Sequence, residues 1–348
     1  MRSLITCGLV GWMGCTDATE PPPPPPRDVV LDTVVGEAGV SPDLVFAIPA
    51  DTRSITIVIE GATAGLYALG AFAVGDGAEL VQLPAGAPGP TMQQQYQQEQ
   101  VGQMPGALFQ SIRLGTFTHV YPYKPGQLVV AGEGLLRVAS DRPGPVTVRI
   151  LMPEDDGANV LALNLYTVSD SLGDPHTPEL AAELTRLFAQ ASIVVTIAAS
   201  ERLTGTALEQ ITDFSEPQEA PASQSAMLPG LVADRDRDGL DIFFVESLPQ
   251  GVGGLALGTP GPPIRGSYYF GVVVRGGLAA TELARITAHE AGHFLALQHV
   301  LNRGTSGRSY PDPLDDTQPG VDNLMEGGTR LTADQAFALS RSALLRVP

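Results

Sequence analysis

Cysteine is nearly missing from this chain, which has only Cys7 and Cys15, both close to the N-terminus. The rest of the chain has no thiols that could form a disulfide, so its fold must depend on a packed apolar core. Basic residues are few, because 20 lysines and arginines stand against 38 aspartates and glutamates, and the formal net charge is −18. A chain with this charge repels phosphate groups, which argues against a nucleic-acid partner.

The N-terminus lacks an apolar run of roughly 20 residues, the length of a membrane-spanning helix. Leu4–Gly14 is shorter and follows the basic Arg2, a pattern typical of an export signal. Gly14 directly before Cys15 resembles the end of a bacterial lipobox; simple secretion and a misassigned start are the alternatives. Pro21–Pro26 would be a stiff spacer or a plain linker. We therefore expect an exported protein, held on the bacterial cell envelope by a lipidated Cys15 or released to the extracellular space.

Histidine is also scarce, yet three of the five histidines lie in one segment, HEAGHFLALQH, from His289 to His299. Residues four apart share one face of an α-helix, so His289 and His293 can bind one zinc ion. Glu290 projects beside them, where its carboxylate can take a proton from a zinc-bound water whose pKa is lowered to roughly 7. A continued helix would turn His299 roughly 120° away from that face. We predict that the helix ends before His299 and that a turn returns this imidazole to the metal; the alternative is a solvated helix with structural histidines.

This segment resembles the metzincin clan of zinc proteases, whose signature is HExxHxxGxxH followed by a Met-turn. The string DNLM, from Asp322 to Met325, resembles that turn in bacterial and pappalysin-like members. The likeness extends over about residues 159–348 and implies hydrolysis of peptide bonds. It also implies one catalytic Zn²⁺ and the roles of five residues: ligands His289, His293 and His299, general base Glu290, and Met325 beneath the ligands.

The chain departs from the clan pattern in two places. Ala296 stands where the clan has glycine, and alanine in a left-handed conformation costs roughly 1 kcal/mol. Glu326 and Gly327 occupy positions where some relatives carry a tyrosine that steadies the oxyanion, so the oxyanion-stabilising side chain is unassigned. Gly292, which weakens a helix by roughly 1 kcal/mol, indicates either close packing of its backbone or no special role.

Length predicts more than one core, and we divide the chain into a leader and spacer (1–27), a β-rich domain (28–153) and a catalytic domain (154–348). Four alternating or β-branched runs predict a β-sandwich: Ser54–Gly61, Leu66–Gly75, Gly126–Gly132 and Gly144–Pro153. The role of this domain is open between binding a surface, covering the cleft and spacing the enzyme. It has no cysteine, which excludes a cysteine switch over the zinc, and its Gln-rich Thr91–Gln100 predicts a solvated loop.

The second half alternates strands and helices, which gives the whole chain an α+β fold class. The predicted strands are Asn159–Asp170, Ser192–Ser200 and Asp241–Leu248. Three threonines are predicted helix caps: Thr177 for Thr177–Ala191, Thr281 for the histidine helix and Thr332 for a C-terminal helix. This order of elements is similar to that of a metzincin catalytic domain.

Two further stretches leave alternatives open. Asp234, Asp236 and Asp238 alternate as in loops that bind hard cations, but Val245 stands where an EF-hand has its glutamate. They form either a Ca²⁺ site of another type or a solvent-exposed turn. Residues 251–277 resemble the segment that borders the metzincin cleft, where an extended peptide can pair with a strand edge. The alternative is a glycine-rich hairpin without a partner.

Together these patterns predict a monomeric zinc endopeptidase that acts on extracellular or surface proteins and peptides. The alternative is a non-catalytic surface lipoprotein, such as an adhesin, in which the zinc is structural. Both would bind zinc, so metal analysis does not separate them, whereas a peptide-library cleavage assay with and without a chelator does.

Overall fold

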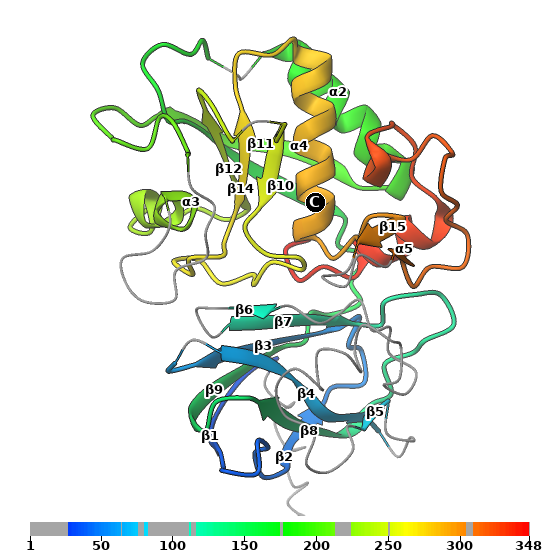
Figure 1. Ribbon diagram of the computed structural model, residues 1–348. Coiled ribbons are helices and arrows are strands. Elements are labelled where there is room, and N and C mark those ends of the chain that lie inside the picture. Colours follow the sequence, from blue (N-terminus) through cyan, green and yellow to red (C-terminus); the bar gives the residue numbers. More distant parts are fainter. Residues whose placement is uncertain are drawn as a thin grey trace, which may run out of the picture.

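A computed structural model describes residues 27–63, 65–75, 80–82, 111–112, 116–174, 177–212, 224–249, 251–303 and 309–347. The predictions for the export signal, Cys15, the polyproline spacer and Thr91–Gln100 lie outside the described residues. The protein has mixed α and β structure with several sheets: antiparallel sheets in the N-terminal half, then a mostly parallel sheet with helices (Figure 1). No helix in the described part of the chain has both the length and the apolar character needed to cross a membrane.

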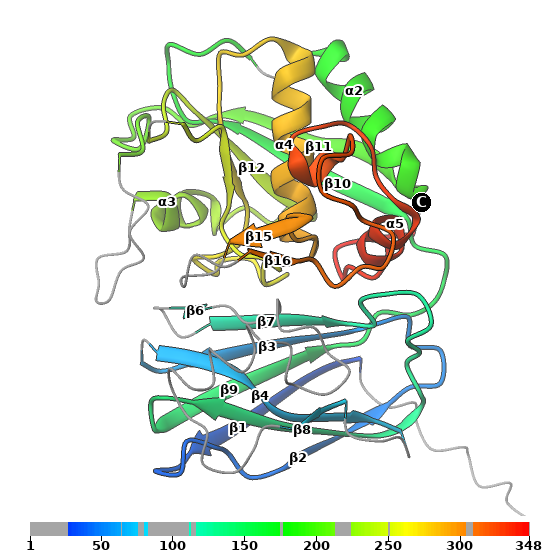
Figure 2. The same ribbon diagram turned by 45° about the vertical axis from the view of Figure 1, so that its right-hand side comes forward.

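The N-terminal half contains two antiparallel sheets, with strand orders β1-β9-β3-β7 and β2-β8-β4-β5, and β6 also pairs with β4. The bounds are β1 Asp28–Val35, β2 Leu44–Ile48, β3 Ile55–Gly61, β4 Gly65–Val74, β5 Val81–Gln82, β6 Ser111–Ile112, β7 Thr116–Tyr121, β8 Gly132–Ser140 and β9 Gly144–Leu151. Phe72 of one sheet contacts His119 and Tyr121 of the other edge-on, with ring centroids 6.3 and 5.6 Å apart. These aromatic contacts join the two sheets, and β4 and β8 of one sheet overlap β9 and β1 of the other in the view of Figure 2.

One predicted strand in this half is wrong. Gly126–Gly132 is an irregular segment, and the strand β8 begins where that prediction ends. The apolar side chains that suggested a strand, Leu128 and Val130, are 72% and 47% exposed. Gly126 has a φ of +89° in a turn that begins at Lys124, and within the described residues no strand pairs with this segment. The strands predicted at Ser54–Gly61, Leu66–Gly75 and Gly144–Pro153 correspond to β3, β4 and β9.

The C-terminal half is built on one five-stranded sheet with the order β11-β10-β12-β14-β13. Its strands are β10 Val160–Thr167, β11 Val194–Arg202, β12 Leu240–Val245, β13 Gly254–Ala256 and β14 Val272–Arg275. Four of them are parallel, and β13 is an antiparallel strand at the edge. Thus β10, β11 and β12 confirm the three predicted strands.

Helices α2 (Pro178–Phe188) and α4 (Ala280–Phe294) pack against each other on one face of this sheet, as Figure 1 shows. The short helix α3 (Gln224–Met227) leads into the segment Leu228–Val232, whose Leu228 and Val232 belong to the separate apolar cluster on the other face. The predicted cap of α2 is confirmed, because the Thr177 hydroxyl accepts a hydrogen bond from the Leu180 amide at 3.1 Å. This packing fixes α4, the helix that carries two of the three clustered histidines.

The predicted cap of α4 is wrong. The helix begins at Ala280, its N-cap is Ala279 without a side-chain hydrogen bond, and Thr281 lies inside the first turn. The first helical bond runs from the Leu283 amide to the Ala279 carbonyl at 2.9 Å. Leu283 is buried, so packing of the helix against the sheet sets its start two residues before the polar signal.

The C-terminal segment contains β15 (Leu301–Arg303), β16 (Ser309–Pro311) and α5 (Ala333–Ser340). Thr332 caps α5 as predicted, in a capping box in which Thr332 and Gln335 each accept the other's backbone N–H.

Contacts between the two halves are polar and partly buried. Arg53, which is 5% exposed, donates hydrogen bonds to the carbonyls of Ala158 and Ser342 at 3.2 and 3.1 Å. Lys124 forms an ion pair with Asp315 at 3.3 Å. The neighbouring Tyr123 is 2% exposed and lies near Asp312 and the backbone of Gln298, next to His299. The N-terminal half therefore contacts the chain that follows α4.

Candidate metal centre

Helix α4 presents His289, Glu290 and His293, and the chain then turns back as the sequence predicted. The helix ends at Phe294, and the residue at the turn, Ala296, has a left-handed φ of +97°. The Ala296 amide bonds the His293 carbonyl at 3.0 Å, and the Leu297 amide bonds the Gly292 carbonyl at 2.8 Å. This pair of bonds is the Schellman arrangement that normally uses glycine at the left-handed position. The chain makes the sharp exit with alanine instead.

The turn brings the three histidines together. The Nε2 atom of His299 lies 3.2 Å from Nε2 of His289 and 3.2 Å from Nε2 of His293. Within the described residues, these three side chains are the group of His, Cys, Asp and Glu that could hold a metal ion. Nitrogen ligands at roughly 2.0–2.1 Å from a tetrahedral centre lie about 3.3 Å apart, so the spacing fits a common metal.

Backbone carbonyls orient two of the imidazoles. Nδ1 of His289 donates to the Leu324 carbonyl at 2.7 Å, and Nδ1 of His293 donates to the Leu297 carbonyl at 2.8 Å. A neutral imidazole that carries its proton on Nδ1 keeps a lone pair on Nε2. Both Nε2 lone pairs are therefore directed at the shared centre, the arrangement commonly found for histidines that bind metal.

The electrostatics of the site favour neutral imidazoles. Burial lowers the pKa of His293 to about 3, with His289 and His299 acting in the same direction. Burial also lowers the pKa of His289 and of His299. Three uncharged rings with converging lone pairs repel one another unless a cation lies between them, so this donor set fits a metal ion.

Glu290 lies beside the histidines and is held by the edge strand. Its Oε2 accepts a hydrogen bond from the Ala256 amide of β13 at 2.9 Å. Burial raises the pKa of Glu290 to about 7, while this hydrogen bond acts in the opposite direction. A Cβ on Gly254 would lie 2.6 Å from Cγ of Glu290, so only glycine lets β13 approach this closely. The sequence placed residues 251–277 at the border of the cleft, but it assigned no individual role to Gly254 or Ala256.

Met325 lies against α4, near the metal ligands. It is fully buried in the short 3-10 helix Leu324–Glu326. The carbonyl of Leu324, the first residue of this helix, accepts the hydrogen bond from His289. A Cβ on Gly292 would lie 3.0 Å from Sδ of Met325. Of the two alternatives for Gly292, the structure shows close backbone packing.

A cavity of about 380 Å³ adjoins this site. It lies between the N-terminal half of α4, the segment Gly251–Gly254 and the chain after Met325, and its wall includes His289 and Glu290. Arg275 and Arg285 also line it, and the sequence analysis singled out neither. Arg285 had a detectable signal, since it precedes His289 by four residues and so shares its helix face.

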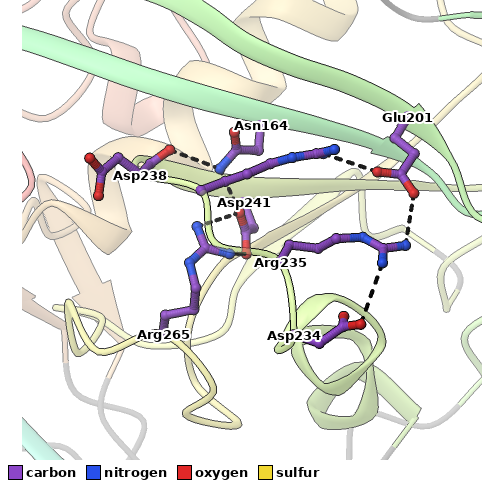
Figure 3. A network of polar contacts seen from close by, with 8 residues as sticks. Asn164, Glu201, Asp234, Arg235, Asp238, Asp241 and Arg265 are labelled. Atoms are coloured by element: carbon purple, nitrogen blue, oxygen red, sulfur yellow. Dashed lines mark hydrogen bonds and ion pairs between the residues drawn. The ribbon is translucent and has the colours of Figure 1, made fainter.

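The aspartates at 234, 236 and 238 do not gather around a centre. Asp234 and Asp238 are 77% and 79% exposed and pair with Arg235 and Arg346 at 3.5 and 3.0 Å. Among the described residues, no cluster suited to a metal includes them. They lie in a solvent-exposed turn, the second of the two predicted alternatives, and Figure 3 shows Asp234 and Asp238 apart from each other.

The arginines of this turn belong to a network of ion pairs. Arg235 and Arg237 both contact Glu201, at 2.8 and 3.0 Å. Asp241, which is 1% exposed, accepts hydrogen bonds from Asn164 at 2.9 Å and from Arg265 at 2.9 and 3.2 Å. Arg265 therefore holds the loop between β13 and β14 against Asp241 of β12 (Figure 3).

Comparisons with known proteins give no family. No protein-family description and no curated protein matches the chain. Among solved structures, the Bacillus subtilis protein YXIM aligns at 10% identity over 62% of this chain and 52% of its own, with a TM-score of 0.18. A structure titled IMPa metallopeptidase in complex with T-antigen aligns at 12% identity over 81% of this chain and 31% of its own, with a TM-score of 0.17. A family two carbohydrate esterase from Cellvibrio japonicus aligns at 9% identity over 64% of this chain and 81% of its own, with a TM-score of 0.12. These scores are too low to support an argument about fold or function.

Proposed function

We propose that this protein is a zinc-dependent endopeptidase of the metzincin type. The observation that carries the proposal is the convergence of three histidine Nε2 atoms with Glu290 beside them. Three imidazole ligands are typical of zinc sites that keep one position open for chemistry. When bound, zinc would supply a Lewis acid that activates water and polarises the carbonyl of the substrate.

The residues of the chain supply the remaining chemistry. Glu290, whose pKa burial raises to about 7, is suited to take a proton from the attacking water and to pass it to the leaving amine. Its hydrogen bond to the Ala256 amide fixes the carboxylate beside the open side of the histidine cluster. In the described part of the chain, β13 pairs with a strand on one side only, and an extended peptide can pair with the part of its other edge that Glu290 does not occupy. The substrate class is therefore protein or peptide.

The proposal extends to export of the protein, either as a lipoprotein anchored through Cys15 or in secreted form. It rests on the apolar segment Leu4–Gly14 and on the Gly14-Cys15 pair. Radiolabelled palmitate incorporation into the parent and into Cys15→Ala tests the anchor, because lipidation requires that thiol.

The test of the chemistry is a cleavage assay on casein and on a peptide library, with and without a chelator. Glu290→Gln should keep the metal, measured by elemental analysis, and should lower turnover at least about 100-fold because the base is lost. Glu154→Gln is a matched control, since Glu154 is exposed and its carboxylate lies 3.9 Å from Arg27, outside the histidine site.

Two results would contradict the proposal. The first is a parent protein that binds zinc at all three histidines but cleaves nothing, which is the behaviour of a surface protein with structural zinc. The second is a Glu290→Gln variant as active as the parent.

A further inference from the structure

The cavity beside Glu290 contains two arginines whose charges are balanced very differently. Arg285 donates two hydrogen bonds to the Glu282 carboxylate, at 3.0 and 2.6 Å, and a third to the Gly327 carbonyl at 2.7 Å. Its charge is thus neutralised and its side chain is fixed. The Glu282 carboxylate in the cavity wall is thus paired with Arg285, and this bidentate contact lowers the pKa of Glu282.

Arg275 has no such partner. It is the last residue of β14 and is exposed, and its amide bonds the Gly253 carbonyl at 2.9 Å, which fixes the backbone against the cavity wall. In the part of the chain that the structure describes, no carboxylate lies within ion-pair distance of its guanidinium. Its charge nevertheless reaches Glu282, whose pKa it helps to lower. Of the four charged side chains in the wall, Glu282 pairs with Arg285 and Glu290 accepts a hydrogen bond from the Ala256 amide, so within the described residues the Arg275 guanidinium keeps no carboxylate partner, on a chain with a net charge of −18.

We propose that this cavity is a substrate subsite for an acidic side chain and that Arg275 is its specificity-determining residue. The inference rests on the proposed peptidase function. The cavity wall includes both Glu290 and His289, so a side chain in it belongs to a residue next to the bond that is cut. A guanidinium binds a carboxylate through two parallel hydrogen bonds, whereas an amide side chain of the same shape has no charge to match. A lysine in this subsite is repelled.

The experiment compares peptides that differ only in the residue entering this cavity: Asp, Asn, Glu, Gln or Lys. We expect the parent to cleave the Asp and Glu peptides at least about tenfold more efficiently (kcat/KM) than their amide counterparts, and more so at low salt. Arg275→Gln should remove this preference while cleavage of the Asn peptide is retained. Arg275→Glu should favour the Lys peptide. Arg137→Gln is the matched control, because it removes the same charge from the exposed ion pair with Asp43 in the N-terminal sheets.

A second measurement does not depend on turnover. Zinc-loaded Glu290→Gln is titrated with the Asp and Asn peptides by calorimetry, alone and with Arg275→Gln. Tighter binding of the Asp peptide that disappears with Arg275→Gln supports the subsite. Equal affinities, or a preference that survives the substitution, overturn it. Cleavage of neutral peptides without an acidic preference rejects the subsite but leaves the peptidase function standing; binding preference without any cleavage rejects the peptidase function alone.

Discussion

Gly292 and Met325 touch across the base of the metal centre, so that a Cβ on Gly292 would meet Sδ of Met325 at 3.0 Å. Gly292 lies one residue before His293, and Met325 follows Leu324, whose carbonyl holds Nδ1 of His289. The contact thus joins the helix that carries two ligands to the turn that orients one of them. A change in the size of either residue should therefore alter metal binding.

Gly292→Ala should therefore weaken metal binding more than it weakens the fold. Alanine gains roughly 1 kcal/mol of helix propensity, which offsets the crowding of Met325, so the free energy of unfolding of the metal-free protein should change by less than about 1 kcal/mol. Displacement of Met325 should pull the Leu324 carbonyl away from His289 and lower zinc affinity by about tenfold. Competition with a zinc chelator measures this affinity. Restoration by a second change, Met325→Ala, is the control, and unchanged zinc affinity in Gly292→Ala would contradict the role of this contact.

Ala296→Gly should stabilise the protein. Ala296 has a φ of +97°, a conformation that costs an alanine roughly 1 kcal/mol relative to glycine. Loss of its buried methyl group removes part of this gain, so the expected increase in the free energy of unfolding is at most about 1 kcal/mol. Urea denaturation of the metal-free protein measures it. Ala296→Val should destabilise, because a β-branched residue tolerates this conformation least; equal stabilities of the three proteins would show that the turn is unstrained.

The metal centre was the most predictable part of the chain because its signals are local. Histidines four apart must share a helix face, and a ligand six residues further can reach the same ion only if the helix stops. The structure brings His289, His293 and His299 together and ends α4 at Phe294. Met325 could be placed near the site only by resemblance, since nothing in its own sequence neighbourhood says which helix it meets.

Features that depend on residues far away in the chain could not be predicted from the sequence. Leu128 and Val130 have the alternation of a strand, but among the residues that the structure describes no strand pairs with them, and local propensity cannot detect a missing neighbour. Ala256 contributes only its backbone amide to Glu290, a role that any residue type except proline could fill. The asymmetry between Arg275 and Arg285 depends in part on the Gly327 carbonyl, 42 residues from Arg285 in the chain, which appears only in three dimensions, whereas the Glu282–Arg285 pair is a local one between neighbouring helix turns.

A buried histidine in the N-terminal sheets should make stability depend on pH. His119 is fully buried without hydrogen-bond partners for its ring nitrogens among the described residues, and burial lowers its pKa from 6.5 to about 3. The folded state therefore keeps it neutral, while the unfolded chain binds a proton below about pH 6.5. Since the unfolded state binds more protons, the free energy of unfolding should fall as the pH decreases from about 6.5 towards 3.

His119→Phe isolates this contribution. The ring size is similar and no proton can bind, so the variant should lose less stability than the parent between pH 7 and pH 4. Denaturation with urea at several pH values, in the presence of chelator, measures the difference in the free energy of unfolding between the two proteins. The other histidines are the same in both proteins, so their effects cancel in this difference. Parallel pH profiles for parent and variant would show that His119 does not remain neutral in the folded state.

Tyr123 links the N-terminal half to the chain that carries His299. Its hydroxyl is buried near the Asp312 carboxylate and the Gln298 backbone; burial and then Asp312 raise its pKa, while Gln298 acts in the opposite direction. The Asp312 amide in turn bonds the Val300 carbonyl at 3.0 Å, so Tyr123 lies near Gln298 on one side of His299 and near Asp312, which is bonded to Val300 on the other side. Tyr123→Ala should leave a cavity beside this segment and cost about 3–5 kcal/mol of stability.

If Tyr123 holds His299 in place, Tyr123→Ala should also lower zinc affinity by about tenfold, and Tyr123→Phe should restore most of it because the ring still fills the site. Tyr67→Ala is the matched control: Tyr67 is 1% exposed in β4 and donates to the Thr63 carbonyl, so its loss damages the N-terminal half without touching the His299 segment. Chelator competition should separate the two alanine variants. Equal zinc affinities in them would mean that the N-terminal half supports the metal centre only through overall stability, whereas a selective loss in Tyr123→Ala makes it a structural part of the centre.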